Sequence, residues 1–250
     1  MTQAIAVGDG PDGRKLGQRI AEKLEKEIVE SGWPVGTVLG SEADLLARLS
    51  VSRAVLREAV RVLEHHGVAA MRRGPGGGLV VTAPDSEAAV RASSLVLEYL
   101  NATPEHVFEA RSALELKCVE LATARIDESG IQRIRETLAI ENERQREGGL
   151  GTHDLHTVLA ELSGNPAFVL FIEVLTTLTT GSRRGHRTPQ AVADVRVAHD
   201  KIAEAVISGD VALARHRMRA HLTAIGEWMN RAERPRPDTG RVPFSDGQIC

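Results

Sequence analysis

The sequence predicts a mainly α-helical protein with an N-terminal winged helix-turn-helix domain and a C-terminal antiparallel all-α bundle. Three observations support this fold class. Aromatic residues make up only 3% of the chain, so the core must be built from aliphatic side chains, which suit packed helices. Apolar residues recur at helical spacing along most of the chain. One glycine-rich hairpin, near residues 68–82, interrupts this pattern.

The first 83 residues contain the signals of a winged helix. Four apolar residues share one face of an expected helix over residues 15–31; they are Leu16, Ile20, Leu24 and Ile28. Ser41 and Ser52 are predicted N-cap residues, each followed by a short helix. Residues 68–71 and 79–82 are expected to form two strands, joined by a Gly/Pro tip over residues 72–78. The order is therefore helix, helix, turn, helix and wing.

The pattern of the sequence beyond residue 85 predicts a series of helices, with Gly, Pro and Asn at the breaks between them. We expect them over residues 86–101, 104–126, 128–147, 153–163, 166–180, 189–208 and 211–229. One apolar set is expected to lie in the core rather than to line a fatty-acid channel; it comprises Leu170, Phe171, Val174, Leu175 and Leu178. The predicted domains are 14–83 for the winged helix and 86–232 for the bundle. Residues 1–13 and 233–250 are polar and expected to be disordered.

Charge and composition narrow the class of protein. The formal net charge is -3, yet residues 48–78 hold six arginines against two acids, a local charge of +4. A basic segment of this kind is typical of a surface that binds a polyanion. No apolar run reaches the roughly 20 residues of a membrane span, and the N-terminus lacks a signal-peptide pattern, so we expect a cytoplasmic protein with no membrane partner. The two cysteines form neither a disulfide framework nor a metal motif.

The predicted third helix carries the chemistry needed to read double-stranded DNA. Arg53 and Arg57 lie four residues apart, so both project from one face, and a major groove admits one such helix. Ser52 at the helix start can contact a phosphate. At the wing tip, Arg73 and Gly74 are placed to reach along a minor groove. High specificity needs more contacts than one winged helix makes, so we expect a homodimer on an inverted repeat.

This segment resembles the GntR family of regulators. The resemblance is carried by PVGTVLGSEADLLARLSVSRAVLREAVRVLEHHGV and by MRRGPGGGLVV. It implies DNA contacts at the Ser-Arg pair, at the following Arg and at the wing-tip Gly, and we add Ser41 and the neighbouring Arg of the wing. The predicted DNA-binding residues are Ser41, Ser52, Arg53, Arg57, Arg73 and Gly74. Many members have Arg where this chain has Ala43, so its operator preference is expected to differ.

The second half resembles the all-α effector domain of the FadR branch, also called FCD. Three stretches carry the resemblance: FEARSALELKCVELATARI, LHTVLAELSGNPAFVLFIE and VAHDKIAEAVISGDVALARHRMRAHL. Many members bind a divalent metal through one carboxylate and three histidines, which correspond here to His156, His199 and His221. The resemblance therefore implies a Zn- or Ni-type ion. Thr152 stands at the usual carboxylate position, so His153 is a possible fourth ligand, and a weakened or lost site is the alternative.

Arg111 and Glu115, spaced four residues apart, allow two roles. Arg111 can hold an effector carboxylate, or the two can form an intrahelical ion pair worth about 0.3–0.5 kcal/mol. Taken together, the resemblances imply a ligand-responsive repressor that a small carboxylate or acyl effector releases from DNA. A metal-free sensor of fatty acids or acyl-CoA is the alternative. A metal-dependent hydrolase is disfavoured, because no HExxH-type motif is present; we therefore expect no enzyme activity.

Overall fold

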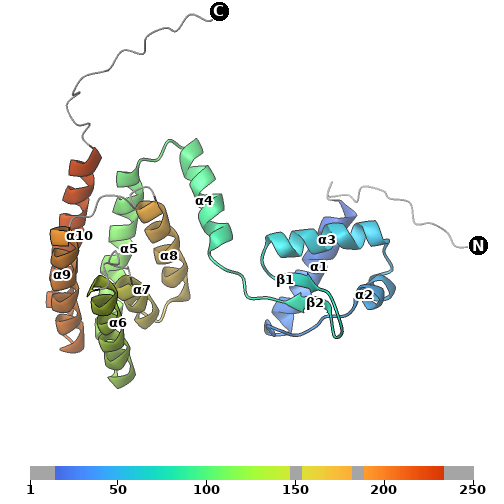
Figure 1. The fold of residues 1–250 in the computed structure, drawn as a ribbon, viewed down its shortest axis with the longest axis horizontal. Helices are drawn as coiled ribbons and strands as arrows, with labels where there is room; N and C mark the ends of the chain where they lie inside the picture. Colours follow the sequence, from blue (N-terminus) through green and yellow to red (C-terminus); the bar gives the residue numbers. More distant parts are fainter. Residues whose placement is uncertain (1–14, 147–153, 182–188, 234–250) are drawn as a thin grey trace, which may run out of the picture. The chain divides into compact units, whose positions relative to one another are not determined.

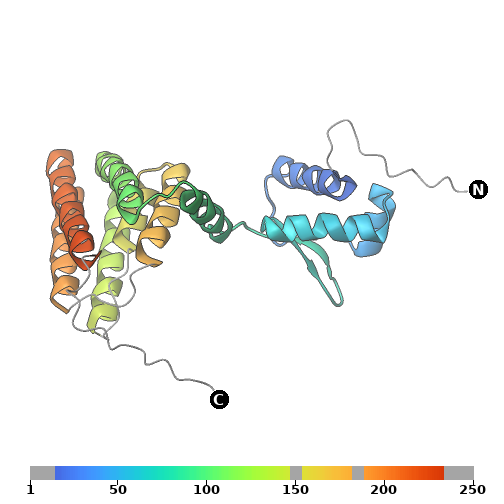
Figure 2. The same ribbon diagram turned by 90° about the horizontal axis from the view of Figure 1, so that it is seen from above.

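The computed structural model describes residues 15–146, 154–181 and 189–233 (Figures 1 and 2). By its contacts the chain divides into two compact units, one up to Ala92 and one from Ser93. The described residues form ten helices and one two-stranded sheet, which confirms the predicted fold class. None of these helices is long and apolar enough to span a membrane. The predicted N-terminal tail, residues 234–250 and His153 lie outside the described residues.

The first unit is built on three helices, α1 (Leu16–Glu30), α2 (Glu42–Leu49) and α3 (Arg53–His65). Helix α1 packs mainly on α3. Their shared core is aliphatic, and its fully buried members include Leu24, Ile28, Leu45, Leu56 and Leu63. Of the four apolar residues predicted to share one face of the first helix, Leu24 and Ile28 are fully buried, and Leu16 and Ile20 are partly buried. Burying each such side chain stabilises the unit by roughly 1.5–3 kcal/mol.

Local hydrogen bonds fix the start of α2 and α3 where the sequence predicts them. The Ser41 side chain accepts the amide of Asp44, and the Asp44 carboxylate accepts the amide of Ser41, which makes a capping box. Ser52 accepts the amide of Val55 at the start of α3. Between the two helices Ser50 adopts a left-handed conformation with φ 53°, which turns the chain within a few residues.

The wing is the antiparallel hairpin of β1 (Ala69–Arg72) and β2 (Gly78–Val81). Residues 36–40 run beside β2, and the amide of Leu39 donates to the carbonyl of Leu79 at 2.8 Å. Gly78, with φ 152°, packs so close that a Cβ there would lie 2.4 Å from the Gly40 carbonyl oxygen. Only glycine fits at this position, so it holds the wing against the preceding segment.

The second unit is an all-helical bundle. Its elements are α4 (Glu87–Tyr99, which begins before the division), α5 (Pro104–Ala124), α6 (Glu128–Arg146), α7 (Asp154–Leu162), α8 (Pro166–Gly181), α9 (Pro189–Ile207) and α10 (Val211–Glu233). Helix α5 is central and contacts α7, α8, α9 and α10 (Figure 1). Every predicted helix is present. The last one continues to Glu233, four residues beyond the predicted end.

The bundle core is aliphatic, with Val119, Ile134, Leu155, Ile202 and Leu222 among its buried members. One prediction about this core is partly wrong. Val174 of α8 is buried, but Leu170 and Phe171 are 41% and 52% exposed. Helix α8 is apolar on more than one face, so its composition could not show which face α5 and α7 would cover.

Candidate metal centre and nucleic-acid interface

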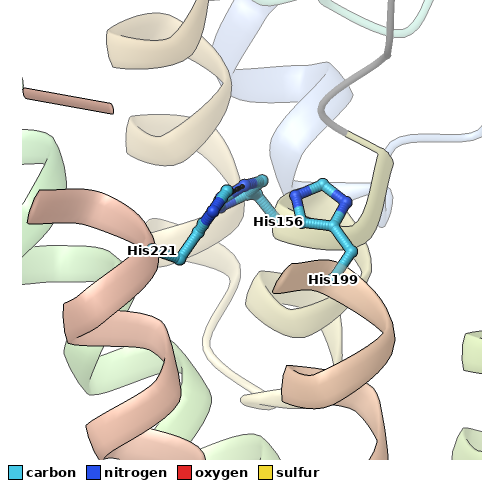
Figure 3. Close-up of side chains that lie close together, drawn as sticks. All are labelled: His156, His199 and His221. Carbon is cyan, nitrogen blue, oxygen red and sulfur yellow. Dashed lines mark hydrogen bonds between the residues drawn. The ribbon is translucent and has the colours of Figure 1, made fainter. Parts of the chain in front are cut away.

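Three buried histidines meet inside the second unit. His156 comes from α7, His199 from α9 and His221 from α10, and their side chains point toward one another (Figure 3). Their exposed fractions are 2%, 2% and 4%. One ring nitrogen of each lies within 4.8 Å of those of the other two. The structure thus brings together all three histidines that the sequence singled out.

Two carboxylates orient two of these rings. Nδ1 of His156 lies 2.7 Å from Oε2 of Glu115, and Nδ1 of His199 lies 2.9 Å from Oε2 of Glu141. A carboxylate only accepts hydrogen bonds, so each Nδ1 carries the proton and donates it. In this tautomer Nε2 of both rings is the unprotonated nitrogen, and it is the atom available to the centre of the cluster. Histidines that bind metals are usually held in this way.

The donor set fits a divalent transition metal. Nε2 of His199 is buried and has no hydrogen-bond partner among the described residues. Nε2 of His156 and Nε2 of His221 are 3.3 Å apart. Two nitrogens that bind one tetrahedral zinc ion at about 2.0–2.1 Å lie about 3.3–3.4 Å apart, so the spacing suits a shared ion. Three imidazoles are ligands that Zn and Ni both accept.

Burial favours the neutral form of two imidazoles in the cluster, those of His156 and His221. Burial lowers the pKa of His221 to about 2, and neighbouring His156 and His199 lower it further. Burial is also the main cause that lowers the pKa of His156, against the opposing charge of Glu115. Neutral imidazole is the form that binds metal. His156 and His221 are therefore in the form that binds a metal near neutral pH.

Arg111 and Glu115 form a buried ion pair on α5. Arg111 Nε donates to Glu115 Oε1 at 2.6 Å, and its Nη1 donates to Thr179 Oγ1 at 3.0 Å. Burial raises the pKa of Glu115, but its interactions with His156 and Arg111 outweigh this and hold the pKa below its ordinary value. The predicted pair is therefore present. It lies in the core, where Glu115 also contacts His156.

Glu141 is a site residue that the sequence analysis missed. Its Oε1 accepts the amide of Leu155 at 3.0 Å, while Oε2 holds His199. A signal was present in the sequence: Ile134, Leu138 and Glu141 follow at i, i+4 and i+7, so the acid lies on the inward stripe of α6. The position of Thr152 and the possible fourth ligand His153 both lie outside the described residues.

The predicted DNA-binding residues lie on the first unit in two groups. Arg53 and Arg57 project from the N-terminal half of α3, and both are exposed. Arg73 and Gly74 are exposed at the tip of the wing. Gly74 has φ 101°, and a Cβ added there would meet no atom within 4 Å, so open space surrounds the backbone. A partner can therefore approach the wing tip closely.

Ser41 and Ser52 lie at the starts of α2 and α3, with Ser41 partly buried and Ser52 exposed. The hydroxyl of Ser41 donates to Oδ2 of Asp44 at 2.6 Å, and its amide donates to the same oxygen at 3.0 Å. Its two protons are thus both committed within the capping box. The Ser52 hydroxyl accepts one amide only, so its proton is available to a phosphate oxygen.

Two family models match separate parts of the chain. Residues 16–80 match the family described as bacterial regulatory proteins, gntR family, and residues 106–224 match the FCD domain. The chain is 30% identical over 216 residues to YcbG of Bacillus subtilis, an uncharacterized HTH-type transcriptional regulator. That alignment covers 86% of this chain and 90% of the relative.

Two further comparisons extend over most of the chain. It is 26% identical over 246 residues to a putative L-lactate dehydrogenase operon regulatory protein of Escherichia coli, with 94% of each chain covered. A solved structure of a GntR protein from Streptococcus agalactiae aligns with a TM-score of 0.62 at 24% identity. That alignment covers 84% of this chain and 99% of the other, and it shows that the fold is shared.

Proposed function

Because this chain belongs to the GntR family of bacterial regulatory proteins and carries an FCD domain, we propose that it is a repressor that binds an inverted-repeat operator as a homodimer. A small carboxylate effector bound to the helical unit releases it from DNA. Proteins of this family are transcriptional regulators and not enzymes. The alternative of a metal-dependent hydrolase is therefore set aside.

The observation that carries the proposal is the exposed basic face of α3. Arg53 and Arg57 lie on it one helical turn apart, and neither forms an ion pair with another described residue. Their guanidinium groups are therefore available to base edges, where arginine commonly binds guanine in a bidentate manner. The exposed wing with Arg73 and Gly74 supplies a second contact to the backbone or the minor groove.

The experiment that tests DNA binding compares Arg57→Ala with Arg19→Ala, a matched change at an exposed arginine of α1. Operator duplexes are first selected from a random pool, and affinity is then measured by fluorescence anisotropy at fixed salt. If Arg57 reads a base, its loss costs about 1–3 kcal/mol, while Arg19→Ala has little effect. Equal operator affinities of the two variants would contradict the proposal that α3 lies in the major groove. The selected duplexes should contain an inverted repeat.

We propose that α4 packs against a second copy of the chain in the homodimer. No residue of this helix is buried, and Leu95, Val96 and Tyr99 are 74%, 56% and 84% exposed. An exposed apolar set of this kind marks an interaction surface. Self-association through this helix would cover the exposed apolar set, and it would give the two-fold protein that the proposed inverted-repeat operator requires.

A divalent ion of the Zn or Ni type is the proposed cofactor, held through Nε2 of His156, His199 and His221. When bound, the ion supplies positive charge and open coordination positions inside the bundle. Glu115 and Glu141 hold two of the rings in the tautomer that binds it. One relative is named for an L-lactate dehydrogenase operon. That name refers to an enzyme of a small carboxylate, and this supports a carboxylate as the effector class.

Of the two roles considered for Arg111, the contacts favour the ion pair. Two of its nitrogens already donate to Glu115 and Thr179, and the side chain is 1% exposed. We propose that it holds Glu115, which in turn orients His156. A direct contact between Arg111 and the effector carboxylate is the alternative role.

The metal-free sensor of fatty acids or acyl-CoA remains the second candidate, and metal analysis separates the two. A bound ion joins three helices, so added Zn or Ni should raise the melting temperature of the chelated wild type. His199→Ala should lose this rise, whereas His216→Ala, at an exposed histidine of α10, should keep it. A wild type that neither carries metal after purification nor responds to added metal would favour the metal-free sensor.

A further inference from the structure

His221 differs from the other two histidines in what its second nitrogen contacts. Nδ1 of His156 and Nδ1 of His199 each donate to a carboxylate. Nδ1 of His221 has no hydrogen-bond partner among the described residues, where this ring bonds only through Nε2. This nitrogen is not fully buried, so solvent reaches it. One of the three positions behind the cluster is thus open.

This open position faces a groove between α9 and α10. The groove has a volume of about 430 Å³, within the range of small-molecule sites. His221 is one of its lining residues. Most of its wall is apolar and comes from Val195, Ala198, Ala220, Ala224, Ile225 and Trp228. The imidazole of His221 therefore contacts the histidine cluster through Nε2, and its opposite edge lies at the groove.

The charges at the groove are unevenly placed. Lys201 and Arg217 line the part that lies toward the start of α10, together with His216. Arg217 is paired with Glu204 at 2.8 Å, but Lys201 forms no ion pair with a described residue. In the other direction, α10 rises about 10 Å over the seven residues from His221 to Trp228. That stretch is mainly apolar, with Asp194 as the acidic lining residue.

We propose that the α9–α10 groove binds a monocarboxylate with an apolar body. Its carboxylate accepts a hydrogen bond from Nδ1–H of His221 and lies near the ammonium of Lys201. Its apolar part extends along α10 toward Trp228. The inference rests on the proposed metal site, because coordination through Nε2 places the proton of His221 on Nδ1. The ligand then completes the set of three carboxylates, with Glu115 and Glu141 as the two built into the chain.

This arrangement couples the ligand to the metal without direct contact between them. A carboxylate behind a metal-bound imidazole increases the basicity of the ring, and such partners commonly change metal affinity by about 10–100-fold. Coupling between two bound species is reciprocal. Metal should therefore increase carboxylate affinity by the same factor that the carboxylate increases metal affinity.

The test uses full-length protein loaded with Co²⁺, which reports its coordination by visible absorption. Straight-chain monocarboxylates from acetate to decanoate are titrated by calorimetry, with primary alcohols of equal length for comparison and with chelated protein in parallel. Ala224→Trp fills the groove from an exposed position on α10, and Ala212→Trp is the control at an exposed position outside it. We expect carboxylates to bind the wild type and Ala212→Trp, and to bind Ala224→Trp at least tenfold more weakly.

Three further results decide the matter. Chelation should weaken carboxylate binding by about 10–100-fold, and the alcohols should bind more weakly than the carboxylates. The Co²⁺ spectrum of Ala224→Trp should match the wild type before ligand is added. Carboxylate affinity that is unchanged in Ala224→Trp would overturn the proposal that the groove is the binding site. So would a carboxylate that replaces water on Co²⁺ as judged by its spectrum, because the ligand would then bind the metal itself.

Operator binding and Co²⁺ uptake, measured on the same preparations, separate this inference from the proposed function. If both are retained while the groove variants behave alike, only the groove is refuted. If wild type takes up no Co²⁺, the metal site fails, and the groove proposal fails with it. If operator DNA is not bound, the proposed regulator itself fails, whatever the groove does.

Discussion

Replacing Glu141 by glutamine is expected to weaken metal binding by changing the tautomer of His199. Glutamine can still accept the amide of Leu155 with its oxygen. Its NH₂ group then faces Nδ1 of His199, where the wild type has a carboxylate oxygen at 2.9 Å. An NH₂ group only donates, so Nδ1 must become the acceptor and the proton moves to Nε2. Nε2 is the atom that faces the cluster, and a protonated nitrogen cannot bind metal.

The structure allows the size of the effect to be worked out. Loss of such a partner typically lowers metal affinity by about 10–100-fold, which is about 1.4–2.7 kcal/mol. Both hydrogen bonds of the residue persist in Glu141→Gln, so the metal-free fold should change by no more than about 1 kcal/mol. Glu141→Ala, in contrast, leaves two buried donors unpaired at about 1–3 kcal/mol each. It should lose both metal affinity and stability.

Zinc affinity is measured by competition with a coloured chelator, and the stability of the chelated proteins by urea unfolding. Glu143→Gln, an exposed acid on the same helix, is the matched control and should behave as the wild type in both assays. Zinc affinity of Glu141→Gln equal to that of Glu143→Gln would refute the reasoning. In that case Glu141 would not set the tautomer of His199.

Three other predictions concern pH, the buried ion pair and assembly. Burial holds the pKa of His221 at about 2, below the unfolded value of about 6.5, so the stability it contributes is complete above pH 6.5 and lost as pH falls. In chelator, urea unfolding should lose about 1.4 kcal/mol per pH unit more in wild type than in His221→Asn, and His216→Asn should match wild type. Arg111→Met leaves Glu115 without its guanidinium partner and should destabilise the protein by about 3–5 kcal/mol in thermal or urea unfolding; a change below 1 kcal/mol would contradict the buried pair. Tyr99→Glu should shift the protein toward monomer in light scattering, and an unchanged dimer would exclude α4 as its interface.

Much of the fold could be predicted because its signals are local. Ser41 and Ser52 determine helix starts through bonds to amides three residues away, and the wing tip is set by its glycines. The histidines were found through their resemblance to a family pattern. Their partners were harder to find, because Glu141 meets His199 across 58 residues of sequence and two separate helices. Nothing in the spacing of either residue points to the other.

The prediction that Leu170 and Phe171 of α8 are buried was wrong for a related reason. Leu170 and Phe171 belong to an unbroken apolar run, residues 167–172, that covers more than one face of the helix. Which face becomes covered depends on where α5 and α7 lie, and this is a property of the packed bundle. Periodicity gives no information on such a helix, whereas it placed Leu24 and Ile28 of α1 correctly.

The buried charges around the histidine cluster have a consequence for the effector. Glu115 and Glu141 contact the histidines and contribute one negative charge each, and Arg111, which pairs with Glu115, contributes one positive charge. Imidazoles must be neutral to bind a metal and then add no charge, so without the ion this set has an excess of one negative charge. A divalent ion reverses this to an excess of one positive charge. Because uncompensated charge in a core is costly, the loaded centre should prefer a partner that carries a single negative charge. Neutral compounds would leave the excess in place, and dianions would reverse it again.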